Sequence, residues 1–288
     1  MSSAVAPPAA AVEDVLDDVL DTEAVGPRLA TQWLGRRYHH RTEVTSTNDV
    51  LTHLAQQGAP AGTVVVAEAQ SQGRGRRGRS WQAAPGQNLT FSLLLRPGWR
   101  PPRLPPLSLA VGVGLAQALA PWLPCAPQLK WPNDLLVGGR KLAGVLVELA
   151  ADAQEVRHAV VGIGINVNQL DFPDELSATA TSLRREHGAP IGRATVLAAA
   201  LAALEAPLEA ALRDQLGPVL QQWTALAAGL GQSVVVTTPQ GAVAGVVSGI
   251  DADGALRVRD AEGRERRLLA GDVLLGPRQA GARAEGRD

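Results

Sequence analysis

A segment made only of glycine and arginine connects two strongly apolar stretches of this chain. It reads GRGRRGR over residues 73–79 and lies between TVVVAEA at 63–69 and NLTFSLLL at 88–95, both typical of buried strands. Residues 70–80 contain no apolar side chain, so the pattern predicts a loop there. The fold must therefore place a strongly cationic loop at the end of a core sheet.

The chemistry of this loop favours an anionic ligand. Glycine lets the backbone approach a ligand closely, and the arginine fork binds carboxylate and phosphate groups in bidentate fashion. Ordering seven residues costs on the order of 7–14 kcal/mol, so a ligand or a neighbouring segment has to offset that cost. We expect a loop that closes over an anion. The alternative is an RGG-like patch that binds nucleic acid, although such patches usually lie in disordered tails rather than between core strands.

A second candidate segment carries the only two lysines of the chain, Lys130 and Lys141. They lie in the sequences LKWPNDL and RKLAG, on either side of the turn Gly138–Gly139, and the flanking residues are predicted to pair as a hairpin. Their ammonium groups are compact charges suited to phosphates, while Asn133 and Asp134 offer oxygen ligands for Mg²⁺. The alternative is an ordinary Asn-Asp turn with lysines at its edges.

Two further segments suit a neutral or flat ligand. Thr45-Ser46-Thr47-Asn48 stands at the start of a helix predicted over 46–57 and offers more hydrogen-bonding groups than one helix cap needs. The strand predicted over 156–168 contains GIGINVN, whose alternating glycines predict close packing of a flat group on one strand face. Asn166 in this strand is a candidate to contact an adenine edge. The alternatives are simple capping and a glycine-containing core strand.

Other sources of chemistry are not apparent. The single cysteine, Cys125, allows no internal disulfide and no zinc cluster. No P-loop, H-E-x-x-H or Ser/His/Asp signature occurs. The net charge of −1 gives no sign of a bulk nucleic-acid binder. Chemistry would therefore have to come from positioned positive charge, which indicates reactions of phosphates.

Together these segments resemble the biotin–protein ligase family. The resemblance extends over about residues 43–276 and rests on TSTN at 45–48, AQSQGRGRRGRSW at 69–81, KWPNDLLV and RKLAGVLVEL within 130–149, and GIGIN at 162–166. It implies an α+β fold, with a mixed β-sheet catalytic domain flanked by helices and a small C-terminal SH3-like β-barrel. Short β-type runs with regular turns after residue 229 independently predict a small sheet or barrel.

The expected organisation has four parts: an acidic N-terminal tail at 1–28, a catalytic domain at 29–228, the small β domain at 229–276 and a loose tail at 277–288. Within the catalytic domain, we expect an apolar helix over about 107–120. A helical stretch is predicted over 193–227, interrupted at Pro207 and at Gly217–Pro218.

The resemblance also implies a site, residue by residue. The residues implied to bind biotin are Ser46, Thr47, Asn48, Gln70, Arg74, Gly75, Arg76, Lys141 and Gly144. Those implied to bind ATP are Arg76, Arg79, Trp81, Lys130, Asn133 and Asn166. The implied catalytic residues are Lys141, Arg76 and Asp134, and the implied Mg²⁺ ligands are Asn133 and Asp134.

The implied activity is formation of biotinyl-5'-AMP from biotin and ATP with Mg²⁺. Biotin then passes to a lysine of a biotin carboxyl carrier protein of a carboxylase, with release of AMP and pyrophosphate. The nearest alternative is a lipoate-type acyl-adenylating protein ligase, and the alternative from another class is a nucleic-acid-binding protein. The residues before position 43 are too few for the winged-helix DNA-binding domain of some family members, so we expect no DNA partner. We also expect no membrane partner and a cytoplasmic location, with monomer and homodimer both open.

Overall fold

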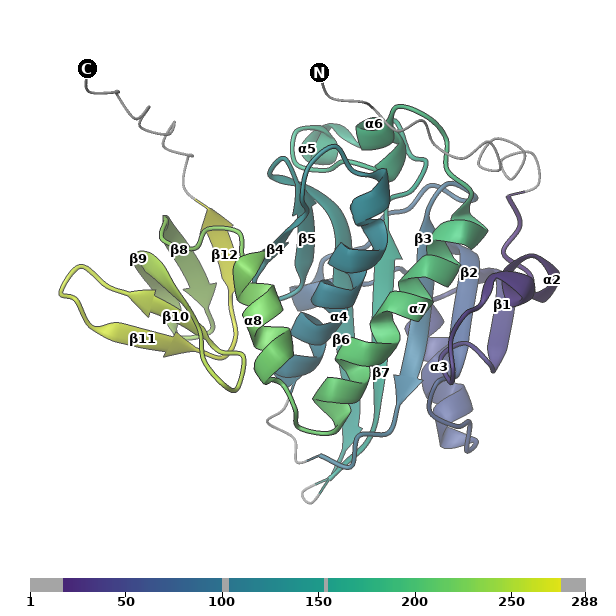
Figure 1. The fold of residues 1–288 in the computed structure, drawn as a ribbon, viewed down its shortest axis with the longest axis horizontal. Helices are drawn as coiled ribbons and strands as arrows, with labels where there is room; N and C mark the ends of the chain where they lie inside the picture. The colour runs from purple at the N-terminus through teal and green to yellow at the C-terminus, as the bar shows by residue number, and fades with distance from the viewer. Residues whose placement is uncertain (1–17, 100–103, 153–154, 276–288) are drawn as a thin grey trace.

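The computed structural model describes residues 18–99, 104–152 and 155–275 of the 288-residue chain (Figure 1). A seven-stranded sheet in the order β1-β2-β3-β7-β6-β5-β4 forms its centre. β1 and β2 run parallel and the other neighbours antiparallel, which confirms the predicted mixed sheet. The strands are β1 (Tyr38–Val44), β2 (Val64–Gln70), β3 (Leu89–Leu95), β4 (Gln128–Lys130), β5 (Asp134–Val137), β6 (Arg140–Ala151) and β7 (Val156–Ile165).

The two faces of this sheet are covered unequally. The helices α4 (Leu104–Leu119), α7 (Arg193–Leu212) and α8 (Gly217–Ala225) lie together on one side (Figure 1). The other side carries α3 (Thr47–Gln56), which packs against β2, β3 and β7. Because side chains alternate along a strand, Val161 belongs to the large core and Val160 to a smaller cluster with Leu51 of α3. Because α3 covers only part of this side of the sheet, the rest of the side is open to a cavity.

Helix α7 corrects one prediction. It runs without a break through Pro207, which is buried, although a proline removes one backbone hydrogen bond. The reason is packing: α7 is apolar along its length and lies against α4, so tertiary burial outweighs the local cost. By length and composition alone α7 could cross a membrane, but half of its apolar stretch is buried inside the protein, as in a core helix. The predicted break near Gly217–Pro218 is confirmed, since α8 begins there.

The C-terminal β domain is an open sheet. Its strands are β8 (Ser233–Thr238), β9 (Gly241–Ile250), β10 (Leu256–Arg259), β11 (Glu265–Leu268) and β12 (Asp272–Leu275). They run antiparallel in the order β11-β10-β9-β8-β12. The small β domain is thus confirmed, whereas the described strands do not close into a barrel. A closed barrel is not needed, because the buried face of this sheet shares one core with the catalytic domain.

Trp131 joins the two sheets. Its side chain is almost fully buried, and its indole N–H donates a 3.1 Å hydrogen bond to the carbonyl of Gly254 in the small sheet. The neighbouring residue Leu129 adds backbone hydrogen bonds of 2.8 Å to Leu226 and to Ala228. The KWPND motif therefore holds the small sheet in place, a role that its sequence did not predict.

Residues 18–28 correct the predicted tail boundary. Leu20 and the helix α2 (Thr22–Val25) pack into the core, with Leu20 fully buried. Asp18 pairs with Arg193 at the start of α7. The acidic composition favoured a short helix and a poorly ordered tail equally, because the basic partner of Asp18 lies 175 residues away along the chain. Residues 1–17 of that tail and the tail at 277–288 lie outside the described residues.

Arg193 supports a stability prediction. The side chain is 3% exposed, and its guanidinium lies 2.8 Å from Asp18 and 2.5 Å from Glu68. Replacing it in Arg193→Ala leaves two half-buried carboxylates without their cation, which should lower the free energy of unfolding by about 3–5 kcal/mol. Urea unfolding followed by circular dichroism measures this. In the control, Arg213→Ala removes an exposed ion pair with Glu209 and should cost about 0–1 kcal/mol. Equal losses of unfolding free energy in both variants would contradict a stabilising role for the ion pairs of Arg193 with Asp18 and Glu68.

Candidate functional site

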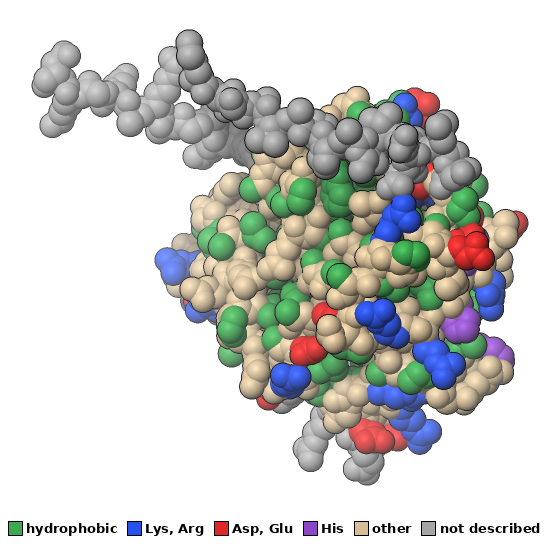
Figure 2. All heavy atoms as spheres, turned by 45° about the vertical axis from the view of Figure 1, so that its right-hand side comes forward, with side chains coloured by type: hydrophobic (Ala, Val, Ile, Leu, Met, Phe, Trp, Pro, Cys, Tyr) green, Lys and Arg blue, Asp and Glu red, His purple; other side chains and the backbone are tan. Residues whose placement is uncertain are grey.

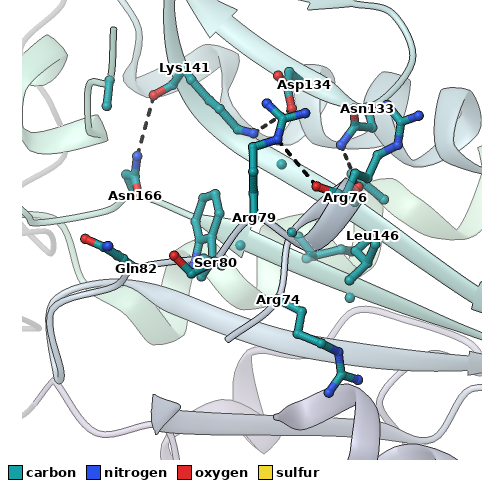
Figure 3. Close-up of a pocket in the computed structure, with 18 of the residues that line it drawn as sticks. Arg74, Arg76, Arg79, Ser80, Gln82, Asn133, Asp134, Lys141, Leu146 and Asn166 are labelled. Atoms are coloured by element: carbon teal, nitrogen blue, oxygen red, sulfur yellow. Dashed lines mark hydrogen bonds and ion pairs between the residues drawn. The ribbon is translucent and has the colours of Figure 1, made fainter. Parts of the chain in front are cut away.

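A cavity of about 440 Å³ lies on the face of the central sheet that α3 covers only in part (Figure 3). Its floor is formed by β6 and β7. Its walls come from the start of α3, residues 74–82, the hairpin of β4 to β6, residues 172–180 and β12. This size is typical of a pocket for a small molecule.

Glycines form the flat part of the floor. A Cβ atom at Gly164 would lie 2.2 Å from the Trp81 ring, and one at Gly162 would lie 2.5 Å from the Asn48 side chain. Gly144 pairs with Gly164 across the strands, and a Cβ there would lie 3.4 Å from Trp81. Within the protein itself, the flat group predicted against this strand is therefore the Trp81 indole. Any larger residue at Gly162 or Gly164 would displace a side chain of the cavity wall.

Buried polar side chains gather where α3 begins. Ser46 caps the helix by accepting a hydrogen bond from the backbone N–H of Asn48. The Gln70 side-chain oxygen accepts from the N–H and hydroxyl of Thr47. The Ser92 hydroxyl oxygen lies within hydrogen-bonding distance of the Thr47 hydroxyl at 2.7 Å and of the Asn48 side-chain oxygen at 2.6 Å. Ser46, Thr47 and Asn48 are all less than 5% exposed. This connected network offers fixed hydrogen-bonding groups at one end of the cavity.

The first arginine of the loop at residues 73–79, hereafter the arginine loop, is held by two carboxylates. Arg74 lies 2.6 Å from Asp49 on α3 and 3.2 Å from Glu148 on β6. The hydrogen bond from Arg74 lowers the pKa of the Asp49 carboxyl below its usual value. Figure 3 shows Arg74 extending to the opposite side of the loop from Arg79 and Lys141. Arg74 therefore ties the loop to α3 and β6, and it also lines the cavity, where its predicted contact with biotin stays a prediction.

The other three arginines of the loop converge on one carboxylate. Asp272 on β12 lies 2.6 Å from Arg79, 3.3 Å from Arg76 and 3.5 Å from Arg77. Arg77 also donates to the carbonyl of Thr237, and its backbone adopts a left-handed conformation with φ of 56°. The conformational cost of this loop has to be offset by a ligand or a neighbouring segment, and the small sheet is such a segment. Asp272 was not predicted, because a residue so far along the chain carries no local signal.

The two lysines share a fourth carboxylate, Asp134. The Lys141 ammonium lies 2.6 Å from Asp134, and the Lys130 ammonium lies 3.4 Å from it. The Lys141 ammonium is also 5.7 Å from the centre of the Trp81 ring. Figure 3 shows Lys141 reaching across the cavity toward Asp134. The predicted hairpin thus brings both ammonium groups to one point.

The two asparagines of the site are engaged with protein groups. Asn133 donates to the carbonyl of Val145 at 2.8 Å, and its oxygen accepts from Arg76 at 3.2 Å. Asn166 is 4% exposed and donates to the carbonyl of Thr181 at 2.9 Å. Among the described residues, no group of three or more His, Cys, Asp or Glu side chains is placed to hold a metal ion. Asp134 is the sole carboxylate among the described residues that line the cavity.

A further wall segment was not predicted. Phe172, Leu176, Thr179 and Ala180 line the cavity opposite the arginine loop. The backbone of Lys141 bonds to this segment, donating to the Thr179 carbonyl at 2.7 Å. The segment contains a short helix, α5 (Asp174–Ser177), and its sequence carries no recognisable ligand-binding pattern.

The structure brings every site residue predicted from the sequence to this one cavity. Five basic side chains line it against one acid: Arg74, Arg76, Arg79, Lys130 and Lys141 against Asp134. Such an excess of positive charge favours an anionic ligand. The individual role of each residue stays a prediction.

Charge outside the cavity does not favour the nucleic-acid alternative. The carboxylates of Asp49, Glu148 and Asp272 contact the four arginines of the loop, so acidic side chains interrupt the basic surface there. Figure 2 shows acidic, basic and hydrophobic side chains mixed on the face that it presents, without one large basic patch. Binding to a nucleic-acid backbone relies on such a patch.

Two family models match the chain. The model for the biotin/lipoate A/B protein ligase family matches residues 39–166, which contain most of the cavity residues. The model for the biotin protein ligase C terminal domain matches residues 229–276, the region of the small sheet.

Individual relatives agree with these matches. The chain is 36% identical over 250 residues to the bifunctional ligase/repressor BirA of Bacillus spizizenii, an alignment that covers 86% of this chain and 77% of the relative. It is 35% identical over 242 residues to the biotin–[acetyl-CoA-carboxylase] ligase of Mycobacterium tuberculosis, covering 80% and 85%. The structure of the biotin protein ligase from Aquifex aeolicus in complex with biotin and ATP matches with a TM-score of 0.73 and 30% identity, covering 84% of this chain and 99% of that one.

Asp272→Asn tests whether this carboxylate orders the arginine loop. The amide keeps the side-chain shape but removes the charge that offsets repulsion among Arg76, Arg77 and Arg79. Hydrogen bonds to charged groups contribute about 1.5–3 kcal/mol. The population of the open form of the loop should therefore rise on the order of tenfold or more. Limited trypsin cleavage after these arginines should accelerate accordingly. Asp253→Asn, which removes an exposed partner of Arg267, is the control. Cleavage at the wild-type rate in Asp272→Asn would refute the role.

Proposed function

The chain belongs to the biotin protein ligase family, and from that premise we propose that it joins biotin and ATP into biotinyl-5'-AMP in this cavity. It then transfers the biotinyl group to a lysine of an acceptor protein. The observation that carries the proposal is the cavity with five basic side chains around a glycine floor. The Aquifex aeolicus relative, whose structure contains biotin and ATP, supports the same pair of substrates. Relatives named for acetyl-CoA carboxylase support a carboxylase carrier protein as the acceptor.

Charge neutralisation is the main task of the first step. A biotin carboxylate oxygen attacks the α-phosphate of ATP, the bond from that phosphate to the β-phosphate breaks, and pyrophosphate leaves. Two anions therefore have to approach each other. Lys141 and Arg76 line the cavity and would reduce this repulsion and stabilise the charge that develops on the phosphate oxygens. Asp134 holds the Lys141 ammonium in an extended position at 2.6 Å, so its contacts favour a positioning role.

The two substrates would use different parts of the cavity. The network of Ser46, Thr47, Asn48 and Gln70 has fixed donors and acceptors suited to the ureido ring of biotin. Arg79 and Lys130 would bind phosphate oxygens, and Trp81 with Asn133 and Asn166 would surround the nucleotide. The indole N–H of Trp81 is buried without a hydrogen-bond partner among the described residues. An acceptor atom of a ligand would satisfy it.

Magnesium fits this cavity as an ion that binds together with the nucleotide. Mg²⁺ usually binds one or two carboxylates together with substrate phosphates and water, and Asp134 is a carboxylate of that kind. Asn133 fits less well, because its oxygen already accepts a hydrogen bond from Arg76. When bound with ATP, the ion neutralises phosphate charge. The protein side chains supply the remaining positive charge.

The second step needs a dry cavity and an entering amine. The arginine loop, held by Asp272 and Asp49, covers the mixed anhydride and limits attack by water. The neutral lysine amine of the acceptor attacks the acyl carbon, the bond from that carbon to the phosphate oxygen breaks, and AMP leaves. The nitrogen loses a proton to solvent and an amide remains. We place this activity in the cytoplasm, where a lone exposed Cys125 stays reduced.

Substrate choice tests the proposal. Pyrophosphate release is measured with ATP and Mg²⁺ while biotin, lipoate or octanoate is offered in turn. We expect release with biotin alone, because the buried polar network at α3 has to pair with a ureido group that the other two acids lack. Faster release with lipoate than with biotin would replace the proposal with the lipoate-ligase alternative.

Lys141→Ala tests the charge argument. We expect folded protein that binds biotin in calorimetry but forms adenylate about 10²–10³-fold more slowly, as for loss of one stabilising donor. The matched control is Arg140→Ala, because this adjacent residue of β6 pairs with Glu186 outside the cavity lining. Wild-type turnover in Lys141→Ala would remove this residue from the mechanism.

A further inference from the structure

We propose that an exposed apolar row on the C-terminal sheet is where the acceptor protein docks. The row consists of Leu274, Val235 and Ala244, which lie directly opposite one another on β12, β8 and β9. Leu274 is 62% exposed, Val235 is 40% exposed and Ala244 is also exposed. Three apolar side chains in register on three neighbouring strands form a continuous surface rather than scattered contacts. This inference rests on the proposed function and names the place of its protein substrate.

The row begins at the rim of the cavity. Successive residues of a strand point to opposite faces, so Leu274 shares a face with Asp272, while Val273 between them is buried in the core. Asp272 on this face holds the arginine loop over the cavity, and Leu274 lines the cavity itself. In Figure 1, β12 lies on the side of the small sheet nearest to β4 of the catalytic domain. From β12 the row leads away from the cavity across β8 and β9.

Geometry indicates a macromolecule as the occupant. The acceptor lysine has a four-carbon stem, so its backbone has to come close to the mouth of the cavity for the ammonium to reach the reaction centre. A folded protein that does so must rest on the surrounding rim. Biotin and ATP bind within the cavity, so they have no use for apolar side chains that extend beyond it. The row therefore suits the apolar centre of a protein contact.

The residues that flank the row on these strands support a weak, specific contact. The next residues on the same face are Asp272, Thr237 and Ala242 on one side and Ser233 with Val246 on the other. Asp272 is already paired with the arginine loop. The row thus has no free charge beside it among these residues, and an uncharged patch on the acceptor would match it. An acceptor that has to leave after each turnover needs only a small interface of this kind.

The test separates docking from chemistry. Val235→Asp and Ala244→Asp place a charge in the row but lie outside the cavity lining. The matched control is Val19→Asp: this valine is also 40% exposed but precedes α2, at the far side of the molecule (Figure 1). Val235→Thr removes apolar character while keeping a strand-forming residue, so it covers the case in which an aspartate disturbs the sheet.

Two activities are measured for each variant. The first is biotin-dependent turnover with ATP and hydroxylamine, a small nucleophile that needs no docking surface. The second is transfer of biotin to a purified biotin-free carrier domain of a carboxylase. We expect unchanged hydroxylamine turnover in all variants. The KM for the carrier domain should rise on the order of tenfold in Val235→Asp and Ala244→Asp, less in Val235→Thr and not in Val19→Asp.

The remaining outcomes overturn the inference in distinguishable ways. An unchanged KM for the carrier domain in both aspartate variants refutes docking on the row. The inference is also refuted if the wild type sediments as a dimer and Val235→Asp dissociates this dimer while the KM for the carrier domain stays unchanged. In that case a second copy of the chain covers the row. Loss of hydroxylamine turnover in these variants would assign the row to the small-substrate cavity. If the wild type releases no pyrophosphate with biotin and ATP, the proposed function itself fails.

Discussion

Neutralisation of the arginine loop is the interaction on which the cavity depends. Four guanidinium groups within seven residues repel one another, and the loop also carries the conformational freedom of three glycines. Asp272 draws three of the arginines together, and Asp49 with Glu148 fixes the fourth. Because Asp272 belongs to the small sheet, the cavity is complete only when that sheet sits against the catalytic domain. The burial of Trp131 between them is therefore part of the site.

Residue size along one strand decides where the cavity lies. On β7, Val160 packs beneath α3, whereas Gly162 and Gly164 on the same face leave room for Asn48 and Trp81. The opposite face of β7 carries Val161 and Ile163, which belong to the continuous core beneath α4 and α7. One strand thus builds a core on one side and a cavity floor on the other. The small sheet adds its buried face to that core, and its other face carries the rim of the cavity.

Strands and helices were predictable where the local pattern agrees with the packing. The apolar runs gave β2 and β3, the glycine pair gave the turn before β6, and Ser46 caps α3 as a serine at that position should. The sequence misled where a distant partner overrides local propensity. Pro207 stays helical because α7 is buried against α4. Residues 18–28 pack against the core, where Arg193 donates hydrogen bonds to Asp18. The small sheet stays open because another domain covers its apolar face.

The sequence by itself determined which side chains are available for chemistry: the arginine loop, the two lysines, the polar start of α3 and the glycines of β7. All of them are local patterns, and the residues that they single out do line one cavity. Only the tertiary structure decided how their charges are paired. It set Asp134 between Lys130 and Lys141, turned Arg74 toward α3 and placed Asp272 against the loop. The physical reason is that electrostatic pairing depends on distance in space, and residues separated by 195 positions come within hydrogen-bonding distance only after the chain has folded.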